Sequence, residues 1–180
     1  MFTRIRFPRF LAAALAAVAL STAVVQPASA QAFSDYAENV IVDRLVRGQA
    51  TPAFPTTWYV ALFTGAGCDD TNTFTNEVAN SNGYARASFT ANMTNWDGTQ
   101  GGNVTVASSG TGGQTKNNVA ITFGTPSGAG WGTVTYWALT DNATRGAGNI
   151  WVCAALTASK TINSGDTVSF AINALTITVQ

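Results

Sequence analysis

The β character of this chain is most evident in residues 131–140, which read Trp-Gly-Thr-Val-Thr-Tyr-Trp-Ala-Leu-Thr. β-branched and aromatic residues dominate this run, as they do in strands. Trp131 and Trp137 fall on one face, because side chains alternate along a strand. With residues 150–157 this run predicts the longest and most aromatic strands. Other extended or alternating runs occupy residues 57–64, 84–91, 104–107, 119–123, 168–172 and 175–179.

Turn-forming pairs separate these runs. They are Asn82-Gly83, Asp97-Gly98, Gly101-Gly102, Gly112-Gly113, Ser127-Gly128 and Ser164-Gly165. About eight short alternating strands with turns at regular spacing predict a mainly β domain, an antiparallel β-sandwich. The alternation also predicts that one face of each sheet is solvated, with threonines on it.

A single short α-helix is expected before the sandwich, within residues 31–50. Ser34 can cap this helix, Asp35 and Glu38 stand in its first turn, and Gly48 can end it. Its apolar stripe consists of Phe33, Ala37, Val40, Ile41 and Leu45. Because these residues recur at helical spacing, the stripe predicts packing against the domain or against a neighbouring subunit.

The first thirty residues have the composition of a secretory signal peptide. Arg4, Arg6 and Arg9 precede an apolar run at residues 11–25, and Ala-Ser-Ala at residues 28–30 forms a cleavage site. The apolar run is shorter than the roughly 20 residues that cross a bilayer. We therefore expect cleavage after Ala30 and no membrane segment in the mature chain, which would be secreted or periplasmic. The expected division is signal peptide (1–30), helix (31–50) and β-sandwich (51–180).

The composition excludes several classes of function. Nine basic and nine acidic residues balance, so the basic surface typical of nucleic-acid binding is missing. The chain has no histidine, the commonest general base and metal ligand. Asp69, Asp70 and Asn72 lack the glycine and distal glutamate of an EF-hand loop and favour a polar turn over a calcium site. The sequence predicts a non-enzymatic protein without catalytic residues, cofactor or metal; a secreted hydrolase is the least favoured alternative.

Cys68 and Cys153 are the two cysteines and the candidates for one disulfide. In an oxidising compartment such a bridge would close a long loop and add about 2–4 kcal/mol. Two unpaired thiols remain the alternative, since spacing does not reveal whether the Cα atoms lie within about 7 Å of each other.

The five tryptophans could fill the core or contact a ligand. They are Trp58, Trp96, Trp131, Trp137 and Trp151. Core packing is favoured for those in strands, because aromatic side chains bury a large area there. Trp96 stands in the loop Asn95-Trp96-Asp97-Gly98. It is the best candidate for an exposed ring that contacts a sugar.

Three segments, taken in order, resemble a family of small bacteriophage tail-fibre proteins. They are residues 33–39 with 43–45, residues 59–64 with 76–78 and 83–86, and residues 131–139 with 155–157 and 170–179. The residues that look like the family signature are Gly83, Tyr84, Arg86, Trp131 and Trp137. We interpret these as structural, with Arg86 as a charge paired with Glu77.

This resemblance implies a non-enzymatic fibre or tip component of a virion. It further implies an N-terminal helix, a β-sandwich body, and assembly into a homo-oligomer or with other virion subunits. Members of the family usually begin near the helix, so the export segment is a departure. Two locations are therefore predicted: the virion if the chain is phage-encoded, and the periplasm or medium if a host exports it. The alternative function is a secreted carbohydrate-binding module or adhesin that contacts a cell-surface glycan.

Overall fold

The computed structural model describes residues 32–66, 68, 71–101, 106–110 and 112–179. The expected signal segment, Asp69, Asp70 and the first half of the strand expected at 104–107 lie outside the described residues. Within the described part the chain forms one helix and nine strands, and every strand pair is antiparallel. The expectation of a mainly β, antiparallel fold with one helix is confirmed.

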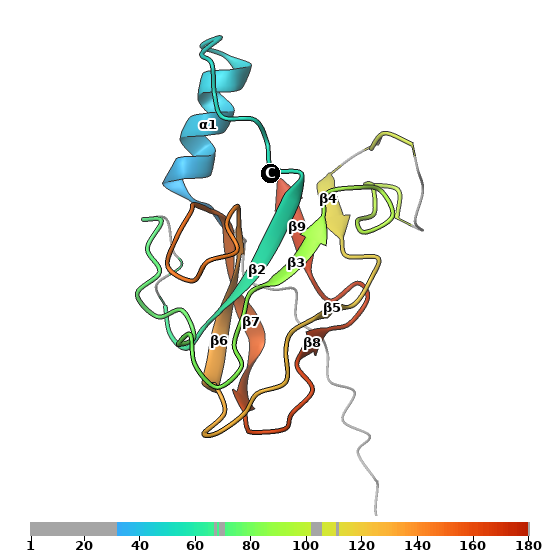
Figure 1. Ribbon diagram of the computed structural model, residues 1–180. Coiled ribbons are helices and arrows are strands. Elements are labelled where there is room, and N and C mark those ends of the chain that lie inside the picture. Colours follow the sequence, from blue (N-terminus) through green and yellow to red (C-terminus); the bar gives the residue numbers. More distant parts are fainter. Residues whose placement is uncertain (1–31, 67, 69–70, 102–105, 111, 180) are drawn as a thin grey trace, which may run out of the picture.

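Five strands form the central sheet, in the order β1-β7-β6-β2-β3. Their bounds are Ala32–Phe33 (β1), Thr57–Phe63 (β2), Ala87–Thr90 (β3), Gly132–Thr140 (β6) and Ile150–Ile162 (β7). The three longest strands lie next to one another in the middle (Figure 1). They correspond to the three runs with the most apolar and aromatic residues, which gain most from burial in a sheet centre.

Two short ribbons complete the fold. β4 (Gly113–Lys116) pairs with β9 (Thr176–Val179), and β5 (Ile121–Thr122) pairs with β8 (Ser169–Phe170). The main hydrophobic core lies between the two ribbons and the central sheet. Leu62 and Trp137 of the sheet share one buried cluster with Ile121 and Leu175 from or beside the ribbons. This layered packing is the sandwich that the alternating strands predicted.

Part of the other face of the central sheet is also buried, so the expectation of one solvated face with threonines holds at Thr133 and Thr161 but is wrong around β2. β2 contributes Val60 and Leu62 to the main core, and Ala61 and Phe63 to a second cluster. The loop that follows β2 covers this second cluster through Phe74 and Cys68. An intervening loop can bury a sheet face in this way without leaving any periodic signal in the strands.

α1 (Asp35–Leu45) lies between β1 and β2 and rises from one end of the body (Figure 1). Ser34 caps it as expected, its hydroxyl accepting from the Ala37 amide at 3.3 Å. Ala37 and Val40 are buried, but Leu45 is 77% exposed. The packed stripe is therefore present in the first part of the helix and absent in its last turn, which extends beyond the sheet.

Candidate assembly and binding surfaces

A buried ion pair connects the loop after β2 to the residue just before β3. The Arg86 guanidinium donates from Nε to Glu77 Oε1 at 2.7 Å and from Nη2 to Glu77 Oε2 at 2.8 Å. Neither side chain is accessible to solvent. The two parallel hydrogen bonds fix the orientation of both groups. The Arg86–Glu77 pairing expected from the sequence is thus present.

Neighbouring groups complete the hydrogen bonding of this pair. Arg86 Nη1 donates to Thr140 Oγ1 at 3.1 Å and to the carbonyl oxygens of Asn142 and Ala147 at 2.6 and 3.0 Å. The backbone amide of Gly146, in the loop between β6 and β7, donates to Glu77 Oε2 at 2.8 Å. Among the described residues, every buried side-chain nitrogen and oxygen has a partner. Because the pair is buried and all its hydrogen-bonding groups have partners, it has a structural role: it links the loops after β2 and after β6 to the central sheet.

Tyr84 extends this cluster into the main core. Its hydroxyl accepts from the Leu62 amide at 3.0 Å and donates to Glu77 Oε1 at 3.2 Å. Burial raises the pKa of the Tyr84 hydroxyl far above its usual value, and the nearby charge of Glu77 raises it further. The hydroxyl therefore stays protonated at neutral pH and serves as a fixed donor.

The other residues that were expected to form the family signature are packed in the core or in a tight turn. The Trp131 ring meets Tyr84 edge to face, with centroids 5.3 Å apart. Gly83 has a φ of +79°, and a Cβ there would lie 2.7 Å from Thr125 O, so a larger residue would force a shift. Trp137 is buried elsewhere in the same core. Four of the five signature residues thus meet around one corner of the body, where each has a packing or hydrogen-bonding role.

Cys68 and Cys153 form a disulfide, and their Cα atoms are 5.6 Å apart. This confirms the bridge and excludes the alternative of two free thiols. The bridge joins positions 85 residues apart, for which loop-closure entropy gives roughly 4–5 kcal/mol of stabilisation. Cys153 also pairs with Ala32 of β1. The disulfide therefore lies beside the strand from which α1 starts.

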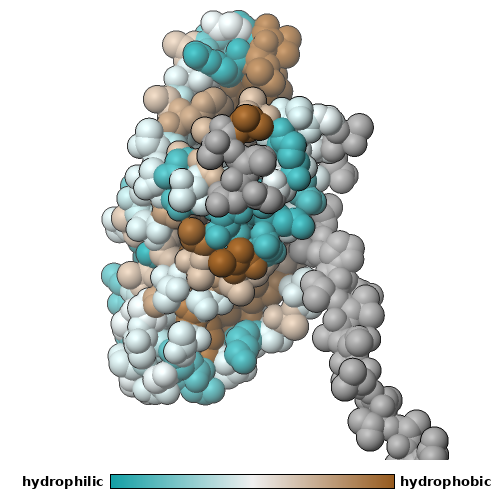
Figure 2. Space-filling model, turned by 90° about the vertical axis from the view of Figure 1, so that its right-hand side faces the viewer, coloured by the Kyte–Doolittle hydropathy of each residue, from teal (hydrophilic) through white to brown (hydrophobic). Residues whose placement is uncertain are grey.

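Four exposed apolar side chains lie on residues 42–54, which we call the arm. The arm comprises the end of α1 and the start of the connector to β2. Val42, Leu45, Val46 and Phe54 are between 50% and 81% exposed, and they are half of the large apolar residues exposed in the described part. The first three share one face of the helix, because they are three and four positions apart. Figure 2 shows this end of the molecule at the top, hydrophobic on one side and hydrophilic on the other.

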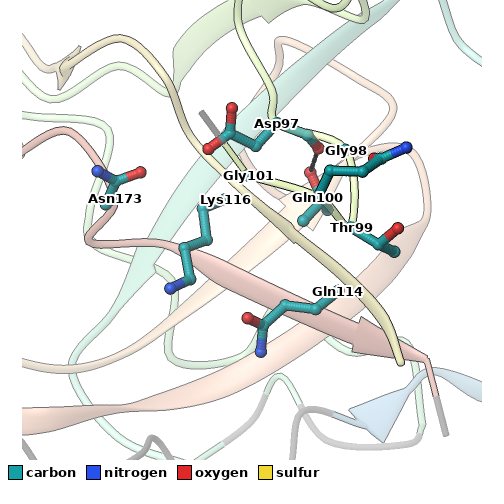
Figure 3. A pocket seen from close by; sticks show the side chains of 9 residues that line it. Asp97, Gly98, Thr99, Gln100, Gly101, Gln114, Lys116 and Asn173 are labelled. Carbon is teal, nitrogen blue, oxygen red and sulfur yellow. Dashed lines mark hydrogen bonds between the residues drawn. The ribbon is translucent and has the colours of Figure 1, made fainter. Parts of the chain in front are cut away.

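A polar hollow of about 370 Å³ opens beside β4. Its lining comes from the turn at residues 97–101, from Gln114, Thr115 and Lys116 of β4, and from Asn173 between β8 and β9 (Figure 3). Sequence reasoning did not single out this group, because amides and hydroxyls scattered over three segments form no motif. Backbone hydrogen bonds from Asp97 to Lys116 and from Asn173 to Asn117 bring the segments together.

Trp96, expected to be an exposed ring, precedes the turn that lines this hollow. The ring is half-buried and packs against Phe89, with centroids 5.0 Å apart. The backbone of Trp96 also bridges to Asn117. The indole therefore supports the turn from the core side and does not stand free as a stacking platform.

Comparison with known families identifies the chain. The model of the Gp80 family, described as podophage GP4 fiber I protein gp80, matches residues 32–178. The chain belongs to this family. The match spans the helix and strands of all three sheets, so the resemblance to a phage tail-fibre family inferred from the sequence is confirmed. No curated protein matches the chain.

Family membership makes the protein a phage structural fibre protein, a class that is non-enzymatic in general. Among the described residues no helix is long and apolar enough to cross a membrane. The described residues likewise contain no group of three or more side chains suited to hold a metal ion. The surfaces left to explain are the arm and the polar hollow.

Proposed function

We propose that this chain is a fibre subunit that assembles with copies of itself through the arm and contributes to attachment at a cell surface. The observation that supports assembly is the concentration of exposed apolar side chains on the arm. A soluble monomer would gain nothing from displaying them, whereas contacts between subunits remove such patches from water. The second copy is the proposed occupant because a fibre is built from repeated subunits.

The arm alone is too small to hold a stable oligomer. A standard interface uses roughly 20–30 residues on each side, whereas the arm has only residues 42–54. The proposed interface therefore includes part of the β body of the next subunit. A cyclic arrangement satisfies this requirement, because each subunit then gives its arm to one neighbour and receives an arm from the other.

The test is the mass of the full chain in solution by light scattering after size-exclusion chromatography. We expect a closed oligomer at micromolar concentration. We expect the double variant Leu45→Lys, Val46→Lys to be a monomer, since it places like charges at the interface beside Arg44 and Arg47. Ile172→Lys makes the same kind of change at a 58% exposed apolar residue of the β body; an oligomer that it leaves intact would show that dissociation is not a general effect of added charge. A monomeric wild type, or a double variant that keeps the oligomer, would contradict the proposal.

We place the assembled fibre on the virion, because the family is a phage fibre family. Export through residues 1–30 is the competing proposal for location, supported by the composition of that segment. Intact mass spectrometry of the native chain separates the two. A chain that starts at Met1 in phage particles supports the virion, whereas a chain that starts at Gln31 in the periplasm or medium supports export.

Attachment to a cell-surface glycan is the second part of the proposed function. The polar hollow beside β4, whose described lining carries one cation and one anion, favours a glycan over a lipid or a nucleic acid. A secreted carbohydrate-binding module would use the same contacts, so the glycan proposal holds for either location. Trp96→Ala is a poor test of it, because loss of a ring packed on Phe89 would also destabilise the core.

A further inference from the structure

We propose that the hollow beside β4 binds one uncharged sugar unit of a glycan through its amide, hydroxyl and charged side chains. The proposal names a ligand and a site for the attachment part of the proposed function, on which it rests. It does not involve the arm.

One side of the hollow is held in place by Asn117, which is fully buried. Its Nδ2 donates to the carbonyl oxygens of Val119 and Ala171, each at 2.8 Å, and its Oδ1 accepts from the Leu175 amide at 2.8 Å. Its own carbonyl accepts from the Asn173 amide at 2.8 Å. These bonds hold Asn173 itself and the residues two positions before and after it, so the backbone of this lining residue is fixed before any ligand binds.

The opposite side of the hollow is tied to β4. The Asp97 amide donates to the Lys116 carbonyl at 2.9 Å, and Thr115 Oγ1 donates to the Asp97 carbonyl at 2.6 Å. Beneath this turn the Trp96 ring rests on Phe89. The two sides of the hollow are therefore built from hydrogen-bonded backbone supported by the core, which is the kind of rigid frame that binding sites use.

Several side chains in the hollow have bonding capacity to spare. Within the described part, the Lys116 ammonium and the Asn173 side-chain amide make no hydrogen bond or ion pair with another residue. Gln114 makes one side-chain bond, from Nε2 to Thr178 Oγ1 at 3.3 Å, which leaves its carbonyl oxygen available. Figure 3 shows these three side chains around the hollow. Amides both donate and accept, as each hydroxyl of a sugar does.

The lining also excludes other classes of ligand. Among the described residues that line it, none is aromatic or aliphatic, so an apolar molecule or a stacked base would find no complementary surface on them. In this described lining Lys116 is the one cation and Asp97 the one anion, so a polyanion would lack the cluster of basic residues that it requires. The volume of about 370 Å³ is near the lower limit of ligand sites, which suits one sugar ring.

The test measures binding of free sugars to the full chain by saturation-transfer NMR. The probes are glucose, galactose, mannose, rhamnose and N-acetylglucosamine, each titrated to tens of millimolar. We expect at least one to bind with a saturable curve. Asn173→Gly and Lys116→Ala should each weaken that binding about tenfold, which corresponds to the loss of one well-formed polar contact.

The variants are chosen so that folding is preserved. Asn173 has a φ of +64°, a conformation that glycine adopts without strain, so Asn173→Gly removes the amide and keeps the backbone. Lys160→Ala is the control for Lys116→Ala, because Lys160 also lies on a strand but lines a different depression. The control should change affinity less than twofold. Equal melting temperatures would show that lost binding is local.

Two outcomes would overturn the inference: no probe binds with saturation, or both hollow variants bind as tightly as the wild type. The oligomer mass, measured on the same samples, keeps this result separate from assembly. A stable oligomer without sugar binding overturns the ligand inference and leaves assembly standing. A monomer that binds sugar supports the ligand inference and overturns assembly through the arm.

Discussion

Two arginine–carboxylate pairs of the same chemistry lie in very different surroundings in this protein. Arg86 and Glu77 pair inside the body, where both side chains are fully buried. Arg47 and Asp43 pair on the arm at 3.2 Å, with 65% and 37% of their side chains exposed. Buried charges without a partner are costly, whereas exposed pairs contribute little. The same residue types thus perform a structural role in one region and coat a surface in the other.

The comparison extends from these pairs to whole regions. The body buries charge and gives it hydrogen-bond partners, whereas the arm leaves Val42, Leu45 and Val46 at least half exposed, and Phe54 packs back on Trp151. In most proteins charged side chains are exposed and large apolar side chains are buried, so a buried charge or an exposed apolar patch points to a specific structural or binding role. The proposed assembly accounts for the exposed apolar groups of the arm, whereas the buried pair of the body needs no partner molecule.

The largest expected effect is the loss of Arg86. Arg86→Met keeps most of the side-chain volume but leaves the Glu77 carboxylate buried without its cation. We expect the free energy of unfolding to fall by about 3–5 kcal/mol, because removal of one partner from a buried pair exposes the full desolvation cost of the other. Urea unfolding followed by tryptophan fluorescence measures this loss.

Arg47→Met is the matched control on the arm, because it breaks the exposed pair with Asp43 by the same substitution. It should cost less than about 1 kcal/mol. Equal losses for the two variants would remove the distinction between the regions. A large loss for Arg86→Met alone would support it.

The fold was largely predictable from the sequence, because the runs that form β2, β6 and β7 are long, apolar and bounded by turns. β4 was missed, since Gly113–Lys116 has no apolar alternation and forms a strand only because β9 pairs with it. The second buried face of the sheet was missed for a similar reason. A loop with irregular sequence covers it, and tertiary contacts of this kind leave no periodic pattern.

The candidate surfaces were less predictable than the fold. The Arg86–Glu77 pair followed from the resemblance, but the saturation of its hydrogen bonds depends on loop carbonyls that no side-chain pattern reveals. Leu45 belongs to an apolar stripe in the sequence, and nothing in that stripe shows where the supporting sheet ends. Trp96 was placed correctly in a loop, but its contact with Phe89 depends on how that loop folds back over the core.

A smaller effect on the free energy of unfolding is expected at alkaline pH, where the hydroxyl of Tyr84 loses its proton. Burial and the Glu77 charge raise the pKa of Tyr84 in the folded state, so above about pH 10 the unfolded chain releases this proton before the folded chain does. The contribution of Tyr84 to the free energy of unfolding is therefore fully present below about pH 10, and it declines as the pH rises beyond that value. At neutral pH Tyr84→Phe should cost about 1–2 kcal/mol, because the Leu62 amide and Glu77 lose a partner.

The same variant should also flatten the alkaline decline. The measurement is the free energy of unfolding from urea titrations at pH 7, 9, 10 and 11 for wild type and Tyr84→Phe. We expect the difference between the two proteins to shrink as the pH rises above 10. A difference that stays constant over this range would mean that Tyr84 is not responsible for the alkaline loss.

The smallest effect on folding is expected for the arm variant Leu45→Lys, Val46→Lys. Both side chains are more than three quarters exposed, and cations are favourable at the C-terminal end of a helix. In dilute solution its free energy of unfolding should therefore stay within about 0.5 kcal/mol of wild type. At higher concentration the proteins should differ, because assembly stabilises the wild type by mass action and raises its melting temperature with concentration. The variant's melting temperature should not depend on concentration, and one that rose as steeply as in the wild type would show that the arm does not hold the subunits together.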